Sequence, residues 1–290
     1  MVEKERKSPF IHYFDKTPEG IRCPHFWILS ASLGCAYFCK YCYLNLSLRY
    51  QKGELPIFYS NQDKMVGEVS EWLEKTETPS VLNCGELSDS LAFEKKLHLL
   101  DRLVPLFEKQ SKHKLLLLTK SADRDIDFLN FHKPTSQVVL SWSVNCNQVW
   151  QDYEKSAPNP FERLSAAYTY MRRGWKVRIR IDPIVPIEDW TSEYNRIVEV
   201  INMLPSPNFR VTLGTIRCFP TLKNFCPPSG VFNHCIDNGD PDRRLRLPFP
   251  VRKSIYQWFA RRLKVKVALC KETEKMIEET NLKSPCNCML

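Results

Sequence analysis

The stretch FWILSASLGCAYFCKYCYL, residues 26–44, decides how this chain is interpreted. Its apolar beginning predicts a strand, and Gly34 permits a sharp turn from that strand into a loop. The loop carries Cys35, Cys39 and Cys42 at C-x3-C-x2-C spacing. Thiolates this close together on one loop can converge on a single metal centre, and sulfur ligands favour zinc or iron–sulfur clusters. The stretch therefore predicts a metal centre just after a first strand.

Two kinds of metal centre are open at this point. A structural zinc site usually takes four protein ligands, but the loop offers three, and a fourth cysteine would have to come from far downstream. Three thiolates on a cubane cluster leave one iron open, and a substrate or cosubstrate can bind there. The missing local ligand favours an iron–sulfur cluster, with a structural zinc loop as the alternative.

With Tyr41 directly before the third cysteine, the motif resembles the signature of the radical S-adenosylmethionine (SAM) superfamily. The longer string Cys-x3-Cys-x-Tyr-Cys-Tyr-Leu, ending at Leu44, resembles more narrowly that of the spore photoproduct lyase family. The resemblance implies that the three cysteines hold a [4Fe-4S] cluster whose open iron chelates SAM. Reductive cleavage of SAM would then give a 5′-deoxyadenosyl radical that abstracts hydrogen from substrate. It also implies an electron donor such as flavodoxin or ferredoxin.

Hydrophobic runs and helical periods alternate along the chain. Strands are predicted over 26–31, 81–84, 114–120, 138–144, 176–181 and 209–216, with helices over 43–50, 61–75, 92–109, 160–173 and 193–204. We expect Pro105 to kink or split the third of these helices. The alternation favours right-handed βαβ units and a parallel sheet with chemistry at the carboxyl ends of the strands.

The fold class is therefore predicted as α/β, a partial (β/α)6 TIM-like barrel, which is also the fold that the resemblance implies. An open doubly wound sheet is the alternative. Residues 1–25 are predicted to be an irregular arm and residues 26–216 the barrel. Residues 217–290 are predicted to form an irregular, Cys-rich extension, with a helix over 251–264 and a strand over 265–269, that serves as a substrate or auxiliary metal region.

Several residues at predicted strand ends match SAM-contacting positions of the family. The stretch with Glu86, Ser88 and Asp89 resembles the one that contacts the amino and ribose groups of SAM. Lys120 resembles a lysine that contacts the SAM sugar or carboxylate, and Ser143 a serine at the fourth strand. A helix N-cap is the alternative role for Ser88 and Asp89, and a solvated side chain that for Lys120.

Other candidate residues are less sharply assigned. Tyr41 and Tyr43 are expected to pack beside the cluster and adenine, with plain core packing as the alternative. Arg180 and Asp182 are either pocket residues or a structural ion pair.

One departure from the family bears on the reaction. In spore photoproduct lyase a cysteine two residues before the Ser-Asp pair returns a hydrogen atom to the product radical, but Glu86 occupies that position here. Cys84 lies two residues earlier, on the same face of a strand but about 7 Å away. Cys84 is therefore the candidate hydrogen donor, and the substrate of this lyase-like enzyme is left open.

Composition limits the remaining choices. Net charge is +9, no run approaches about 18 apolar residues, and the charged N-terminal residues do not resemble a secretory signal. We expect a cytoplasmic chain with no membrane partner, whose 12 cysteines are thiols and ligands rather than disulfides.

The net charge and the basic 243–262 segment favour nucleic acid as substrate, with a small molecule or a peptide still open. An ordinary solvated face is the plainer interpretation of that segment. A different class of function is a non-catalytic, zinc-stabilised nucleic-acid-binding protein that uses the same cysteines. Near the other end of the chain, Cys270, Cys286 and Cys288 are either ligands of a second metal centre or core thiols beside a mobile tail.

Overall fold

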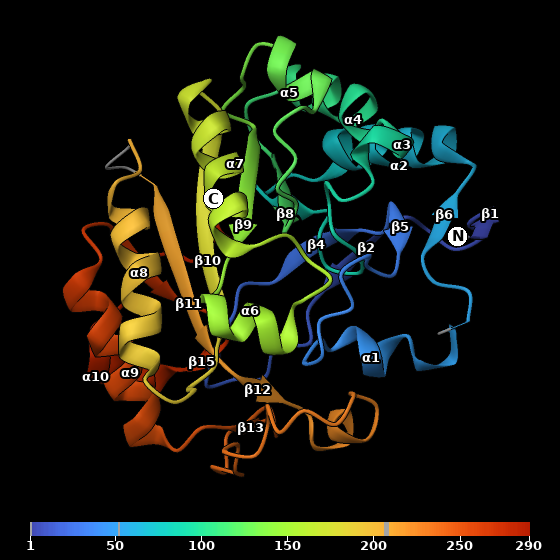
Figure 1. Cartoon of the computed structure of the whole chain (residues 1–290). Coiled ribbons are helices and arrows are strands. Elements are labelled where there is room, and N and C mark those ends of the chain that lie inside the picture. The colour runs from blue at the N-terminus through green and yellow to red at the C-terminus, as the bar shows by residue number, and fades with distance from the viewer. Residues whose placement is uncertain (1, 52, 206–208) are drawn as a thin grey trace.

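The computed structural model describes residues 2–51, 53–205 and 209–290. An eight-stranded sheet in the order β14-β11-β10-β9-β8-β7-β4-β2 forms its centre (Figure 1). Neighbouring strands from β4 to β14 are parallel, and β2 is antiparallel to β4. The strands are β2 (Ile11–Phe14), β4 (Phe26–Leu29), β7 (Val81–Asn83), β8 (Lys114–Thr119), β9 (Val138–Ser143), β10 (Lys176–Ile184), β11 (Arg210–Thr215) and β14 (Lys266–Leu269).

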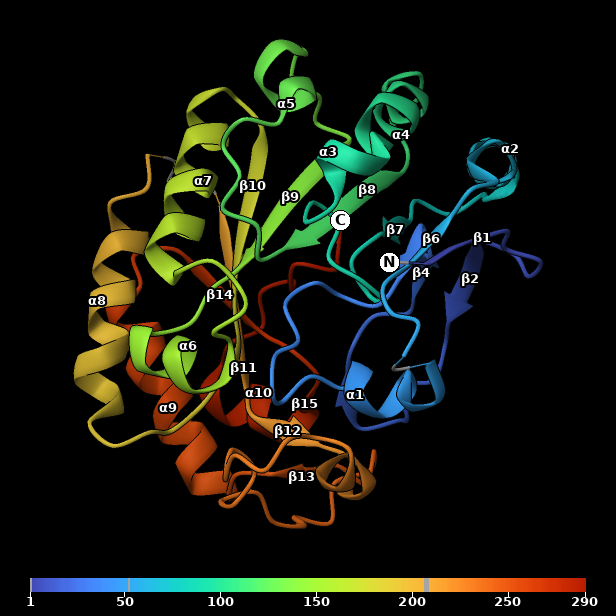
Figure 2. The same ribbon diagram turned by 45° about the vertical axis from the view of Figure 1, so that its right-hand side comes forward.

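Helices follow most of these strands and cover the outer face of the sheet, so the predicted α/β fold with a parallel sheet is confirmed. Figure 2 shows α7 and α8 on that outer face and the loop before α1 on the inner side. The helices are α1 (Leu44–Ser47), α2 (Gln62–Lys75), α3 (Glu94–Leu97), α4 (Leu99–Glu108), α5 (Asp127–Phe131), α6 (Asn147–Tyr153), α7 (Pro160–Arg172), α8 (Trp190–Asn202), α9 (Phe249–Arg262) and α10 (Glu274–Thr280).

Short elements complete the fold. β1 pairs with β6, which pairs with β5, and β12 pairs with β13. β3 pairs with β15, and two 3-10 turns follow α1 and β12. Their bounds are β1 (Val2–Lys4), β3 (Ile21–Arg22), β5 (Ser32–Leu33), η1 (Arg49–Gln51), β6 (Ile57–Tyr59), β12 (Arg217–Cys218), η2 (Pro220–Asn224), β13 (Leu245–Arg246) and β15 (Glu272–Thr273).

The alternation of side chains along β9 separates the two faces of the sheet. Trp142 points outward, where its ring stacks on Tyr170 of α7 with centroids 5.8 Å apart. Ser141 and Ser143 are its neighbours on the strand and therefore point to the inner face. All residues of β9 are buried, as a parallel strand covered on both faces should be.

The residues predicted to be an irregular arm contain β1, β2 and β3, so that expectation of irregular structure is wrong. Within β2, Tyr13 contacts Trp27 of β4 with ring centroids 4.9 Å apart, and Phe14 contacts Phe26 at 5.2 Å. Cross-strand aromatic pairs of this kind stabilise an antiparallel pair. Because residues 1–25 are mostly polar, the sequence did not indicate this strand pairing.

The predicted helix over 92–109 is divided, but at His98 and not at Pro105. His98 has a φ of 48°, and Pro105 lies inside α4. The carboxylate of Glu94 accepts hydrogen bonds from the backbone N–H groups of Leu99 and Leu100, at 3.2 and 2.9 Å. These bonds satisfy donors at the start of α4 and stabilise the break.

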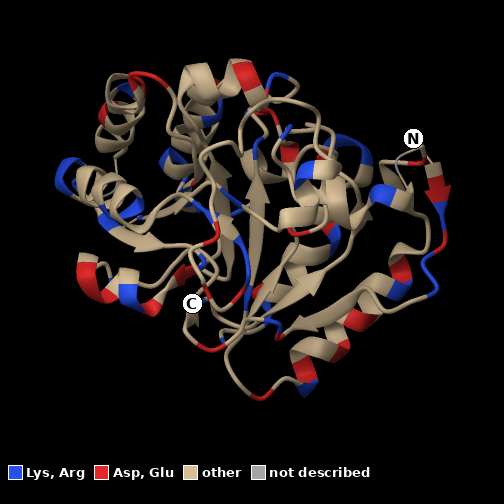
Figure 3. Ribbon diagram, turned by 90° about the horizontal axis from the view of Figure 1, so that it is seen from below, with Lys and Arg blue, Asp and Glu red and all other residues tan. Residues whose placement is uncertain are grey.

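The segment after residue 216 is tied to the sheet. β14 pairs with β11 as a further parallel strand beyond the six predicted for the barrel. In α9, Arg252 is fully buried and its Nη1 lies 2.5 Å from Glu272 Oε2. Arg252 therefore does not belong to the exposed basic face predicted for this helix. Figure 3 shows Lys and Arg both on outer helices and on the central strands.

No helix in the described part of the chain is long and apolar enough to cross a membrane.

The buried pair of Arg252 and Glu272 allows a test of this packing. Glu272→Ala leaves the guanidinium buried without its main partner, and we expect the free energy of unfolding to fall by about 3–5 kcal/mol. Lys253→Ala, on the same helix, breaks the exposed contact with Glu279 and should change it little. Urea denaturation followed by circular dichroism measures both. Equal effects of the two substitutions would contradict the burial of this pair.

Candidate functional site

A cavity of about 1110 Å³ opens at the carboxyl ends of the parallel strands. Its wall combines the loop after β4, the ends of β7 to β10 and residues near the end of the described chain. The lining includes every residue predicted to bind metal or cofactor: Cys35, Cys39, Cys42, Tyr41, Tyr43, Glu86, Ser88, Asp89, Lys120 and Ser143. Residues from separate predicted strand ends thus share one space.

The cysteine loop is fastened to the loop after β7. Gly34 has a φ of 89°, and a Cβ atom at this position would meet Leu55 at 2.8 Å, so the sharp turn requires glycine. Its N–H donates to the Leu87 carbonyl at 2.9 Å. The hydroxyl of Tyr43 donates to the Glu86 carbonyl. Tyr43 therefore has a positioning contact within the wall.

The middle of the motif is held by buried charges. The Tyr41 hydroxyl hydrogen-bonds to the carboxylate of Glu154, which lies 2.6 Å from the guanidinium of Arg163. Burial alone would raise the pKa of Glu154, but Arg163 and Lys120 hold it below its usual range. Arg163 also donates to the Ser143 carbonyl at 3.2 Å. Neither Glu154 nor Arg163 carries a local sequence signal, because the pairing exists only in the fold.

The surroundings of the motif thiols oppose their ionisation. Burial raises the pKa of Cys39 to about 12 and also raises those of Cys35 and Cys42, so these thiols need a positive partner to ionise. Among the described residues, no group of three or more His, Cys, Asp or Glu side chains is placed to hold one metal ion. In an iron–sulfur cluster each thiolate binds a different iron, so the sulfurs need not meet at one point.

Asp89 has an observed structural role. Its Oδ1 accepts from the N–H groups of Leu91 and Ala92, at 3.0 and 2.9 Å, and from the Thr119 hydroxyl at 2.7 Å. Its Oδ2 accepts from the Lys120 N–H at 2.6 Å. These bonds satisfy the turn that follows and fix the loop against the end of β8. The predicted helix N-cap at Asp89 is wrong, because the next helix, α3, has Phe93 as its N-cap. SAM binding by Asp89 stays a prediction.

Lys120 and Ser143 were predicted separately from two strands, and the structure brings them together. The Lys120 ammonium donates to the Ser143 hydroxyl at 3.1 Å. Burial lowers the pKa of Lys120, but Glu154 and Cys39 more than offset that effect and raise it. Lys120 is therefore a fixed positive charge beside the cysteine motif.

Arg180 and Asp182 line the same cavity but do not form the predicted ion pair with each other. Asp182 is held by both terminal nitrogens of Arg217, at 2.9 and 3.1 Å. The Arg180 guanidinium instead contacts the sulfurs of Cys270 and Cys288, at 3.5 and 3.4 Å. Sequence reasoning missed Arg217 because it lies just beyond the last predicted barrel strand, in a segment predicted to be irregular.

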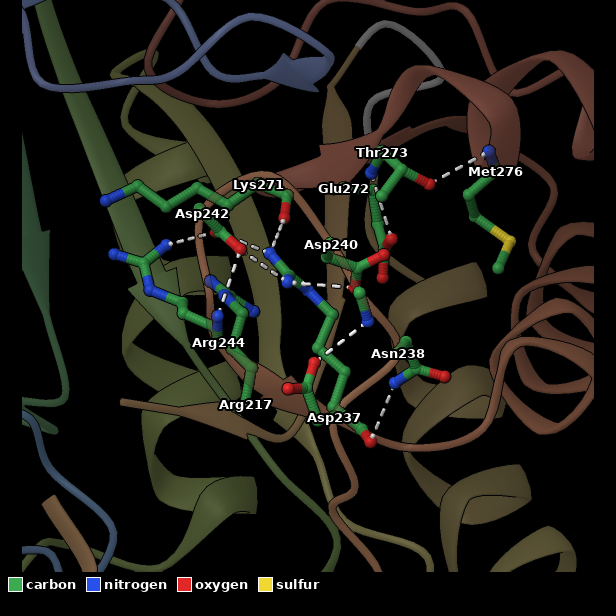
Figure 4. Close-up of polar contacts among 12 residues, drawn as sticks. Arg217, Asp237, Asn238, Asp240, Asp242, Arg244, Lys271, Glu272, Thr273 and Met276 are labelled. Carbon is green, nitrogen blue, oxygen red and sulfur yellow. Dashed lines mark hydrogen bonds and ion pairs between the residues drawn. The ribbon is translucent and has the colours of Figure 1, made fainter. Parts of the chain in front are cut away.

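The segment that carries Arg217 is itself held by a buried arginine. Arg246 contacts Asp240 at 3.0 Å and Asp242 at 2.6 Å, and donates to the Lys271 carbonyl at 3.1 Å. Figure 4 labels these three partners. Arg244 shares Asp242 at 3.1 Å and lines the cavity. The basic residues of this stretch are thus partly structural and partly exposed to the cavity.

Cys84, the candidate hydrogen donor, is not among the described residues that line the cavity. Its side chain is buried, with Ser90 and Glu94 close by. Burial raises the pKa of its thiol to about 12. A role for Cys84 in the reaction stays a prediction, and its position gives that role no support.

A family model described as spore photoproduct lyase matches residues 25–216. A curated spore photoproduct lyase from Clostridium acetobutylicum is 26% identical over 169 residues, which cover 57% of this chain and 48% of that protein. The chain thus spans about half the length of the curated relative that it matches.

Solved structures show the same fold. A spore photoproduct lyase complexed with dinucleoside spore photoproduct has a TM-score of 0.73 and 17% identity, over 90% of this chain and 77% of that one. A mutant spore photoproduct lyase with bound AdoMet and dinucleoside spore photoproduct has a TM-score of 0.73 and 16% identity, over the same 90% and 77%. At these identities the likeness concerns the fold alone.

Two glycine substitutions test how closely the loop that follows β7 approaches β8. A Cβ at Gly85 would meet Leu118 at 2.6 Å, so Gly85→Ala should lower the free energy of unfolding by about 1–3 kcal/mol. Gly67 lies exposed in α2 with nothing within 4 Å of a Cβ, and Gly67→Ala should raise it by about 0.5–1 kcal/mol. Thermal and urea unfolding measure both. A neutral Gly85→Ala would contradict the close approach.

Proposed function

The chain belongs to the spore photoproduct lyase family, as its cysteine motif predicted, and on that basis we propose that it is a radical SAM enzyme. Its cavity would hold a [4Fe-4S] cluster on Cys35, Cys39 and Cys42, with SAM on the open iron. The observation that carries this proposal is the common cavity lined by these cysteines and by the candidate SAM residues. When bound, the cluster and SAM would supply the radical that abstracts hydrogen from substrate.

The protein residues would position and shield this chemistry. Tyr41, through Glu154 and Arg163, holds the cysteine loop against the barrel. Lys120 places a positive charge beside Cys39 and Cys42, where it would stabilise an anionic cluster and attract the SAM carboxylate. Ser88 and Glu86 would present acceptors to the SAM ammonium and ribose hydroxyls. An electron donor of the flavodoxin or ferredoxin kind would supply the electron.

We propose nucleic acid carrying a spore photoproduct as the substrate. The solved relatives hold dinucleoside spore photoproduct, and the charge and the aromatic rings of the cavity in this chain suit a nucleic acid. Among the described lining residues, positive side chains outnumber the negative Glu86, Asp89 and Asp182. Phosphates favour such a wall and bases stack on exposed aromatic rings. The positive residues are Lys16, Arg22, Lys120, Arg180, Arg217, Arg244 and Lys271, and nearby phenylalanines include Phe38 and Phe219.

SAM cleavage tests the enzyme proposal directly. The chain is reconstituted with iron and sulfide without air, reduced, given SAM and assayed for 5′-deoxyadenosine. We expect a brown protein that forms this product, and no product from Cys39→Ala, because one cluster ligand is lost. A colourless protein with tightly bound zinc would overturn the proposal and leave the zinc-stabilised binding protein as the explanation.

Phe219 tests the substrate proposal. It lines the cavity, is 41% exposed, and lies under Arg244, whose guanidinium carbon is 4.5 Å from the ring centroid. Phe219→Ala should weaken binding of a photoproduct-containing oligonucleotide by about 1–3 kcal/mol, the usual value of one stacked base. That is about 5- to 150-fold in Kd, measured by fluorescence anisotropy.

Phe131 gives the matched control, because it is 86% exposed on α5 and does not line the cavity. Phe131→Ala should leave Kd unchanged. If both substitutions had the same effect, the cavity would not be the nucleic-acid site.

A further inference from the structure

The last residues of the described chain are bound across the inner face of the sheet. Asn287 is 1% exposed, and its N–H donates to the Thr212 hydroxyl of β11 at 2.8 Å. Its side-chain amide donates to Ser141 of β9 at 3.0 Å and to the Ile179 carbonyl of β10 at 2.9 Å. Arg178 donates to the Asn287 carbonyl at 2.5 Å. The segment around Asn287 is therefore fixed, and the mobile tail considered from the sequence is not observed.

This anchoring places two thiols in the cavity wall, one on each side of Asn287. Cys286 and Cys288 both line the cavity and are hydrogen-bonded to each other. Cys288 also lies 3.4 Å from the Arg180 guanidinium. Arg180 has an Nε without a hydrogen-bond partner among the described residues. Two of its described neighbours are sulfurs, those of Cys288 and Cys270, so a thiolate suits its charge.

The surroundings of Cys288 favour ionisation. The hydrogen bond from Cys286 and the charge of Arg180 lower the pKa of Cys288 against the effect of burial. Lys271 also lowers it, while Glu86 and Cys23 oppose ionisation. Cys288 therefore ionises more readily than an ordinary thiol. The pKa of Cys286 is raised instead, so this thiol keeps its proton.

We propose that Cys286 and Cys288 form a redox-active dithiol that reduces low-molecular-weight disulfides entering the cavity. The Cys288 thiolate attacks one sulfur of the disulfide, which forms a mixed disulfide and releases a thiolate. The released thiolate takes the proton of Cys286. The Cys286 sulfur then attacks Cys288, which forms the internal disulfide and releases the second thiol. Two protein thiols are oxidised while one disulfide is reduced to two thiols.

This chemistry is separate from the proposed radical reaction. Cys286, Cys288 and Arg180 are not members of the cysteine motif, and the exchange needs neither cluster nor SAM. The buried thiols elsewhere behave differently: burial raises the pKa of Cys235 and of Cys146 to about 12. We therefore expect exchange at the dithiol and not at these positions.

The test uses glutathione disulfide and the full chain, reduced and kept without air. After acid quenching and trypsin digestion, residues 284–290 form one peptide whose only cysteines are Cys286 and Cys288. We expect mass spectrometry to show this peptide without two hydrogen atoms. The rate should rise with pH as Cys288 ionises, through a midpoint below that of an ordinary thiol. A guanidine-unfolded sample supplies the control, with a midpoint near the ordinary thiol pKa of about 8.5.

Two serine variants separate the roles of the thiols. Cys286→Ser keeps a hydroxyl as hydrogen-bond donor but cannot complete the exchange, so one glutathione should stay attached to Cys288. Cys288→Ser should react far more slowly, because burial still opposes ionisation of the remaining Cys286 thiol. Arg180→Met should move the midpoint of the wild-type profile upward.

The proposal is overturned if the wild-type peptide stays reduced, or if the folded and unfolded samples have the same midpoint. It is also overturned if Cys288→Ser reacts as fast as the wild type. None of these readings depends on SAM cleavage, so a failure here is distinct from a failure of the radical SAM proposal.

Discussion

The buried ion pair of Glu154 and Arg163 is the interaction on which the cavity wall depends. Their closest atoms are 2.6 Å apart, and both side chains are almost fully shielded from water. Two charges in such a place stabilise the structure only if their remaining hydrogen-bonding groups are satisfied. Tyr41 and the Ser143 carbonyl provide some of those bonds. The cysteine loop, β9 and α7 are thereby joined at one point, and the barrel itself sets where the motif lies.

Much of the fold follows from local pattern. Strand β8 is an apolar run in the sequence, β10 alternates apolar and charged residues, and the C-x3-C-x2-C loop follows β4 as predicted. Lys120 and Ser143 were predicted as site residues from the family resemblance, and their side chains meet because parallel strands end at one edge of a sheet. Side chains at strand ends can thus be placed at a shared cavity once the strands have been predicted.

The features that sequence reasoning missed depend on partners far away in the chain. The sequence predicts Arg252 as part of a basic helical face, but its side chain is buried and contacts Glu272, 20 residues later in the chain. Asp182 of β10 and Arg217 of β12 form an ion pair that neither local sequence indicates. The break at His98 is stabilised by the hydrogen bonds that the Glu94 carboxylate accepts from Leu99 and Leu100. Composition and periodicity describe a residue's neighbours along the chain, whereas these contacts are set by the completed sheet.

An open barrel leaves two sheet edges, and here β2 and β14 occupy them. Each of these strands is only four residues long. A long, unpaired edge would present a row of backbone donors and acceptors on which another polypeptide could add a strand, and so promote aggregation. The short edge strands give little template for such growth. The sheet can therefore stay open without edges that promote aggregation.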